Sequence, residues 1–272
     1  MKLTTPAAAL LLAATVTAAD AATIVPHRAV YDLRLTRASE GAALSNVDGR
    51  MAFEIMGSAC EGWTVSFRMV NRFRPADGTA KLLDTQSTSY ESGDGLDLRY
   101  SQKEYVDNRL DQESRVKVSR LETQGDGTGQ IELPAPKDFT VPAEALFPMR
   151  HQLRLMDAAL SGETRDASLI YDGSDGDKTF RAISFIGKRK DAGGNVRDKR
   201  NPEAATLAAL ASWPMTISYY AAAGGDQDTP TYQIGFDMYE NGVATGLVLD
   251  YGDFALDGEL AKLELLAADT CE

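Results

Sequence analysis

The chain has 272 residues, of which 43% are hydrophobic and 25% are charged, and its formal net charge is −12. This apolar content supports a packed core and excludes a wholly disordered protein. The negative charge argues against nucleic acid as a partner, because a phosphate backbone requires a cationic face. It also argues against adhesion to an anionic membrane through a basic patch.

The first residues have the pattern of a secretory signal peptide. Lys2 precedes a run of mostly Ala, Leu, Val and Thr, and small residues around Ala21 suit cleavage. The apolar run is about a dozen residues long, short of the roughly 20 that cross a membrane as a helix. We therefore expect residues 1–21 to be removed and residues 22–272 to form one soluble domain in an oxidising compartment. A buried or amphipathic N-terminal helix is the alternative.

An oxidising compartment would allow the two cysteines of the chain to form a disulfide bond. Cys60 lies in a glycine-containing turn and Cys271 is the penultimate residue. In an exported protein, two cysteines favour one intramolecular bridge, which here would hold the C-terminal tail. Two free thiols, or an intermolecular bond through Cys271, are the alternatives.

Period-two alternation of apolar and polar residues predicts strands along most of the chain. The predicted strands are 31–35, 50–55, 63–69, 79–91, 96–100, 116–118, 131–133, 168–171, 179–186, 215–220, 232–239, 243–251 and 259–266. The strand at 79–91 is polar, so we expect it at an edge of the sheet or over a wet cavity. The pair Asn241–Gly242 predicts a hairpin between two of the later strands.

One segment has helical spacing instead. The apolar residues Met149, Leu153, Met156 and Leu160 predict a helix over 148–160 with one stripe packed on the sheet. A weaker helical segment is 202–211. No repeat and no linker divides the chain, which is therefore predicted to be all-β with one or two helices, folded as a barrel or curled sheet.

The sequence offers little material for catalysis. His27 and His151 are the two histidines, and no Gly-x-Ser-x-Gly motif presents a nucleophile. We expect both histidines to be structural and the protein to have no catalytic residue and no metal site. The acidic run 172–177 has oxygens that suit calcium, but Asp and Gly are also what a tight turn needs, and we favour the turn. The segment 125–129 has the glycine content of a phosphate loop but lacks the Lys that follows one.

Ligand-binding residues are not identified by any motif. Trp63, Tyr90, Tyr219 and Tyr220 are candidates for lining a ligand groove, although aromatic residues on strands mostly belong to the core. The many acidic residues always contain possible carboxylate pairs for glycoside hydrolysis, but no spacing selects one. The residues alone thus predict an exported β-domain without a recognisable active site.

Several segments, taken in order, resemble the EipB family of periplasmic cell-envelope-integrity proteins. They are 27–33, 49–51, 57–63, 146–148, 169–175, 239–243 and 250–254. The resemblance covers nearly the whole mature chain. It implies a spiral-shaped, incomplete antiparallel β-barrel wrapped around a helix, with Cys60 and Cys271 as its bridging pair.

The resemblance also implies a function. A member of this family is expected to be a monomeric, non-enzymatic, cofactor-free periplasmic protein that supports envelope integrity under stress. Its partners are expected among other periplasmic envelope proteins, or to be a lipid or lipoprotein. The fold is similar to that of lipoprotein carriers, so an acyl-chain carrier is the alternative function, and a hydrolase of envelope glycans is a third hypothesis.

Overall fold

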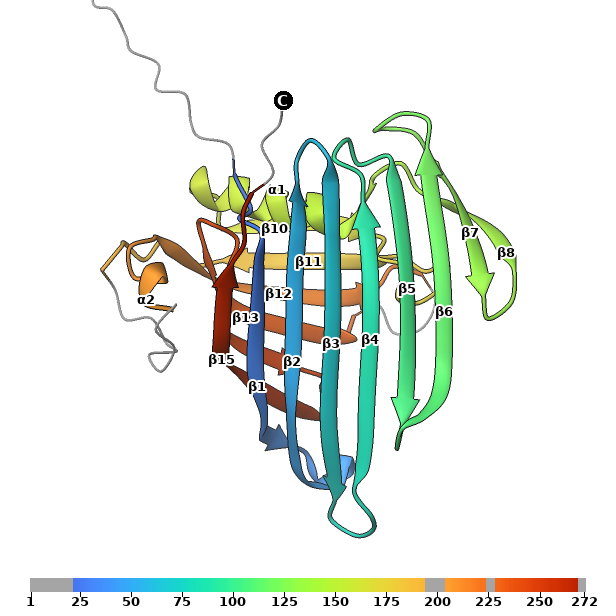
Figure 1. The fold of residues 1–272 in the computed structure, drawn as a ribbon, viewed down its shortest axis with the longest axis vertical. Coiled ribbons are helices and arrows are strands. Elements are labelled where there is room, and N and C mark those ends of the chain that lie inside the picture. Colours follow the sequence, from blue (N-terminus) through green and yellow to red (C-terminus); the bar gives the residue numbers. More distant parts are fainter. Residues whose placement is uncertain (1–21, 194–203, 224–227, 269–272) are drawn as a thin grey trace, which may run out of the picture.

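The computed structural model describes residues 22–193, 204–223 and 228–268. Its main feature is one 15-stranded sheet with the strand order β8-β7-β6-β5-β4-β3-β2-β1-β15-β14-β13-β12-β11-β10-β9. Neighbouring strands are antiparallel, except for the short parallel pair of β9 and β10. The sheet curls so that β1 to β5 pass in front of β10 to β13, which run across them (Figure 1).

The first half of the sheet is built from long strands. They are β1 (His27–Ala38), β2 (Leu44–Ser58), β3 (Gly62–Pro75), β4 (Lys81–Glu91), β5 (Asp97–Val106), β6 (Arg109–Arg120), β7 (Gly127–Leu133) and β8 (Lys137–Val141). The second half consists of β9 (Ala145–Leu146), β10 (Arg165–Ile170), β11 (Phe180–Ile186), β12 (Ser212–Ala221), β13 (Tyr232–Tyr239), β14 (Ala244–Asp250) and β15 (Phe254–Leu265). The helices are α1 (Pro148–Leu160), α2 (Ala204–Leu207) and the 3-10 turn η1 (Glu40–Ala42).

The two edges of the sheet, β8 and β9, do not pair with each other. The barrel is therefore nearly closed but keeps an unsealed seam between these strands. The predicted fold class, an incomplete antiparallel barrel with one or two helices, is confirmed. The interpretation of the strand at 79–91 as an edge is wrong, because β4 lies between β3 and β5 in the middle of the sheet.

Apolar and polar residues alternate along the strands because one face of the sheet is buried and the other is more exposed. On β1, the side chains of Ala29, Tyr31 and Leu33 are buried, whereas the residues between them are more exposed. The buried set points to the inside of the barrel, and the alternate set forms its outer face. The sequence missed β8 and β9, whose few residues are too short a run to show a period.

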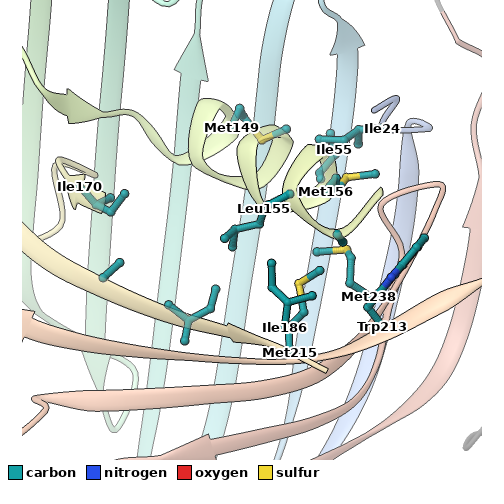
Figure 2. Packing of buried hydrophobic residues seen from close by; sticks show 14 of the residues in the cluster. Ile24, Ile55, Met149, Leu155, Met156, Ile170, Ile186, Trp213, Met215 and Met238 are labelled. Atoms are coloured by element: carbon teal, nitrogen blue, oxygen red, sulfur yellow. The ribbon is translucent and has the colours of Figure 1, made fainter. Parts of the chain in front are cut away.

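Helix α1 closes one end of the barrel by packing between the two halves of the sheet. Met149, Leu155 and Met156 on α1 belong to a cluster that also contains Ile55 of β2 and Trp213 of β12 (Figure 2). Because residues of β2, β3, β11, β12 and β13 all join this cluster, the helix supplies a shared core to distant parts of the chain. No helix among the described residues is long and apolar enough to span a membrane.

The predicted stripe of α1 is partly wrong. Leu160 is 46% exposed, whereas Leu155 and the small residues Ala158 and Ala159 are buried. The small side chains let the helix approach the sheet closely on that side, which turns Leu160 outward. The start at Pro148 and the position of Gly162 just beyond the end agree with the prediction. Of the weaker helix, only Ala204–Leu207 is helical among the described residues.

The N-terminus of α1 is capped by a residue of β4, a strand in the first half of the sheet. The N-cap residue, Phe147, has no side-chain cap. Instead, the buried carboxylate of Glu91, at the end of β4, accepts hydrogen bonds from the backbone N–H groups of Met149 at 2.8 Å and Arg150 at 3.0 Å. A carboxylate at a helix N-terminus satisfies two unpaired donors and interacts favourably with the helix dipole. Glu91 thereby fixes α1 to the middle of the sheet.

Burial raises the pKa of Glu91 to about 7, although the two N–H donors and the charges of Arg150 and Arg120 act in the opposite direction. The native state therefore holds this proton more tightly than the unfolded chain does. Protonation of Glu91 therefore contributes fully to the free energy of unfolding at pH values below the pKa that this group has in the unfolded chain. The contribution is lost as the pH rises through 7. Burial lowers the pKa of His151, on the next turn of α1, to about 4, and that group acts in the opposite sense.

We expect the stability advantage of the wild type over Glu91→Gln to grow as the pH falls. Between pH 8 and pH 5 the difference in unfolding free energy should widen by about 2–3 kcal/mol, the value of two pKa units. Both proteins keep His151, so its effect cancels in the comparison. Urea denaturation at the two pH values measures the change, and a pH-independent difference would contradict the assignment.

Candidate functional site: the inner face of the sheet

An apolar strip on the inner face is left only half-buried by the core. It is formed by inward residues of β2 and β3, Phe53, Val65 and Phe67, and of β13, Ile234 and Phe236. These side chains pack against the core clusters on both sides of the barrel but keep accessible surface. The interior of the barrel is thus lined, beyond α1, by apolar groups that protein atoms do not fully cover.

The inner face becomes polar on the neighbouring strands. Thr85, Ser87 and Ser89 of β4 point inward in register with Met69, Phe67 and Val65 of β3. On β5 the inward residues are Tyr100 and Gln102, and the Tyr100 hydroxyl donates to Oε1 of Gln102 at 2.5 Å. The interior therefore has an apolar side and a hydroxyl-rich side.

Tyrosines line the part of the interior opposite β4 and β5. The rings of Tyr219 on β12 and Tyr232 on β13 stack at 4.5 Å between centroids. Burial is the main cause that raises the pKa of both phenols, and the charge of Asp172 raises it further. Burial and Asp172 also raise the pKa of Tyr100 to about 12. These phenols stay protonated at neutral pH and can donate hydrogen bonds.

Asp172 begins the acidic segment 172–177, which forms a turn. Its Oδ1 accepts hydrogen bonds from the backbone N–H of Ser174 at 2.9 Å and from the Ser174 hydroxyl at 2.8 Å. Gly173 has a positive φ of 79° and lies against the Tyr100 ring. Burial raises the pKa of Asp172. No group of three or more His, Cys, Asp or Glu side chains that could hold a metal was found among the described residues.

The same turn helps to hold the seam. Phe139 on β8 contacts the ring of Tyr171 at 5.6 Å between centroids, and Lys137 pairs with Asp177 at 2.7 Å. The buried Arg120 donates to the carbonyl of Ala145 at 2.6 Å and to that of Pro142 at 3.2 Å. Side chains therefore close the seam where backbone pairing between the two edges is missing.

The two histidines are buried in the framework. Nδ1 of His27 donates to the carbonyl of Val25 at 2.7 Å, and burial lowers its pKa. Nε2 of His151 lies 4.0 Å from Oδ2 of Asp166, a carboxylate that Arg154 also binds at 2.6 Å. The two rings lie on different elements, β1 and α1. His27 contacts a backbone carbonyl, and His151 lies near the carboxylate of Asp166.

The aromatic candidates do not form one groove. Trp63 is part of the core around α1, and the hydroxyl of Tyr90 donates to the carbonyl of Glu61. Tyr220 lies on the outer face, where the Arg181 guanidinium lies over its ring. Trp63 and Tyr219 both lie on the inner face, but Trp63 is buried in the core around α1 and Tyr219 is only partly buried. Sequence reasoning missed Glu91, Arg120 and Tyr232, because no local motif marks a residue whose partner is distant in the chain.

Cys60 lies at the turn between β2 and β3, as predicted. Cys271 lies outside the described residues, as does the expected signal peptide. The bridge between Cys60 and Cys271 therefore stays a prediction. The last residues of segment 125–129 already belong to β7 (Gly127–Leu133), so no helix follows the segment.

The fold and its inner face define a β-barrel-like protein with a seam, a helix inside one end and a half-buried interior. The EipB-like family model matches residues 18–267. The cell envelope integrity protein EipB of Brucella abortus (strain 2308) is 36% identical over 250 residues, which cover 91% of this chain and 86% of that protein. The chain belongs to the EipB-like family.

A solved structure agrees with this assignment. It is the crystal structure of a beta-barrel-like protein of the domain of unknown function DUF1849 from Brucella abortus. The two structures superpose with a TM-score of 0.83 at 33% sequence identity, and the match covers 91% of this chain and all of that one.

The docking of the 172–177 turn on the inner face can be tested at Gly173. A Cβ at this position would lie 2.8 Å from Cβ of Tyr100. We expect Gly173→Ala to lower the unfolding free energy by about 1–3 kcal/mol more than Gly162→Ala does, because overpacking adds to the strain of a positive φ. Gly162 is a matched control, since it has a φ of 78° and open space around it. Equal losses in urea denaturation would contradict the contact.

Proposed function

We propose that this protein is an exported, periplasmic, monomeric protein that supports the integrity of the cell envelope without catalysing a reaction. The observation that carries the proposal is its membership of the EipB-like family along nearly the whole chain, together with a relative named for envelope integrity. The signal-like sequence of residues 1–21 supports export. Partners would be other envelope proteins, or a lipid or lipoprotein.

The environment of the histidines supports a non-enzymatic role. A general base must reach the proton that it removes. His27 is 1% exposed and His151 is 4% exposed, and both contact structural groups. We further propose that Cys60 and Cys271 form a bridge that fixes the C-terminal tail to the turn between β2 and β3.

We expect a strain lacking the gene to become sensitive to detergents and to cell-wall antibiotics. A plasmid copy of the wild type should restore resistance, whereas a copy lacking residues 2–21 should not, because its product would stay in the cytosol. A His151→Gln copy that accumulates to the wild-type level should also restore resistance. Growth on plates that contain each agent measures the effect.

Normal tolerance of the deletion strain would contradict the envelope role. Rescue by the copy without residues 2–21 would contradict export. Loss of rescue by a folded His151→Gln protein would contradict the non-enzymatic proposal.

A second candidate function is an acyl-chain carrier that binds a lipid or a lipoprotein chain inside the barrel. The half-buried apolar strip on β2, β3 and β13 favours it, because apolar side chains that remain accessible in a concave interior are typical of lipid and small-molecule sites. Entry through the seam would require the side-chain contacts that close it, such as the pair of Lys137 and Asp177, to separate.

We expect the delipidated protein to take up a fluorescent fatty acid, and Phe67→Gln to weaken this binding at least fivefold. Phe67 points inward, and a polar amide there would be buried against the acyl chain without a partner. Thr64→Gln is the control, since Thr64 lies on the outer face of the same strand. A titration followed by fluorescence measures both variants. Absence of uptake by the wild type would exclude the carrier function.

A further inference from the structure

The outer face of the first half of the sheet carries a groove that the functions proposed above do not use. It has a volume of about 480 Å³ and crosses strands β1 to β6. Its charged side chains point away from the barrel, because they alternate with inward residues such as Phe53 and Phe67. This is the side of the long strands that faces away from β10 to β13 in Figure 1. We call it the outer groove.

The floor of the outer groove is a row of hydroxyl groups on adjacent strands. Ser66 of β3 is in register with Thr88 of β4, which is in register with Ser101 of β5. Gln86 lies beside this row on β4. Short polar side chains offer hydrogen-bond donors and acceptors to a ligand. The groove also has apolar surface, from Ala52, Phe53 and Phe67.

The walls of the outer groove are more basic than the rest of the protein. Four basic side chains line it against two acidic ones, Glu54 and Glu113, an excess of two positive charges in a chain of net charge −12. A second hollow of about 420 Å³, further along the same face, is lined by three arginines and two aspartates. Part of this positive charge is neutralised by carboxylates just outside the two hollows, since Arg28 pairs with Glu264 as well as with Glu54, and Arg34 pairs with Glu259. An anionic ligand is therefore favoured only where the basic side chains have no such close partner.

The basic residues are not neutralised equally. Arg68 makes two hydrogen bonds to the carboxylate of Asp84, at 2.8 and 3.0 Å. In contrast, Lys103 and Arg115 make only long contacts with the carboxylate of Glu113, at 3.8 and 3.9 Å, and Glu132 is the other carboxylate that interacts with Arg115. Both side chains are about half exposed, at 50% and 54%. The end of the groove on β5 and β6 therefore has cationic groups with capacity for another anion.

The register places these cations at the end of the hydroxyl row. Arg115 of β6 lies directly opposite Ser101, and Lys103 lies opposite Glu113. From Arg28 on β1 to Arg115 on β6 there are five steps between strands, which at about 4.8 Å a step span about 24 Å. A ligand that uses this whole length is an oligomer with hydroxyl groups along it.

We propose that the outer groove binds an extended anionic glycan, whose carboxylate or phosphate group contacts Lys103 and Arg115 and whose hydroxyls contact Ser66, Thr88 and Ser101. Charge-assisted hydrogen bonds from Lys and Arg hold the anion. The hydroxyl floor hydrogen-bonds the sugar. The charged and hydroxyl side chains of this site point away from the interior, because neighbouring residues of the same strands point to opposite faces. The two sites share only Phe53 and Phe67, which also belong to the apolar strip inside the barrel.

Isothermal titration calorimetry with three soluble oligosaccharides tests the proposal. The first carries carboxylates, as in muramidase fragments of peptidoglycan, and the second carries phosphates, as in a core oligosaccharide freed of its lipid. The third is a neutral oligosaccharide of equal length. We expect binding of one or both anionic glycans and at least tenfold weaker binding of the neutral one. Which anionic glycan binds identifies the source of the ligand.

The double variant Lys103→Gln and Arg115→Gln should weaken anionic binding at least tenfold. The matched control is Lys81→Gln with Lys262→Gln, which removes the same charge at exposed positions outside the groove. Thr88→Val should weaken binding about threefold to tenfold at an almost unchanged side-chain volume. Urea denaturation of each variant, with a free energy of unfolding close to that of the wild type, shows that the fold is intact.

The proposal is overturned if neither anionic glycan binds, or if the neutral one binds as tightly as they do. It is also overturned if the control variant weakens binding as much as the groove variant, because the effect would then be one of overall charge. Loss of glycan binding in a variant with an unchanged free energy of unfolding concerns the outer groove alone, so it leaves the functions proposed above untouched.

Discussion

The arrangement of the barrel depends on the placement of α1, and the buried carboxylate of Glu91 is the contact that fixes where this helix begins. Its two hydrogen bonds to the first turn join the end of β4 to a segment that follows 58 residues later. From this starting point the buried side of α1 reaches β2 and β3 on one side and β11 to β13 on the other. A sheet with unpaired edges thus obtains a common core.

The curled sheet gives its central strands two different surfaces. On β3, Phe67 points to the half-buried interior and its neighbours Ser66 and Arg68 point to the outer groove. The inner surface combines apolar, hydroxyl and tyrosine groups, whereas the outer surface combines hydroxyl groups with excess positive charge. Alternation along a strand, which the fold requires for burial, therefore also separates the half-buried apolar surface from the surface proposed to bind an anionic glycan.

Local patterns in the sequence predicted most of the elements. The period-two rule identified β13 with its observed bounds, and helical spacing identified α1. The same rules missed β8 and β9, because strands this short carry no measurable period. They also placed Leu160 in the buried stripe, since spacing alone does not show how Ala158 and Ala159 rotate the helix against the sheet. The spiral shape followed from the family resemblance and not from the periodicity.

The candidate sites could not be predicted in the same way. Glu91 and Arg120 act on groups far away in the sequence, and the row Ser66, Thr88 and Ser101 exists only through the register of three strands. Tyr219 was among the aromatic candidates, but its stacking partner Tyr232 was not. Residue types suggest which chemistry is possible, while pairing between strands decides which residues meet.

The central claim is that the buried side of α1 stabilises both halves of the barrel, and the substitutions Leu155→Ala and Leu160→Ala test it most directly. Leu155 is buried at 1% exposure, and Leu160 lies on the same helix at 46% exposure. Leu155→Ala should lower the unfolding free energy by about 2–5 kcal/mol, and Leu160→Ala by about 0.5 kcal/mol or less. Hydrogen exchange in the Leu155→Ala protein should rise together in β2–β3 and in β11–β12. Equal stability of the two variants, or faster exchange in only one half of the sheet, would contradict the account.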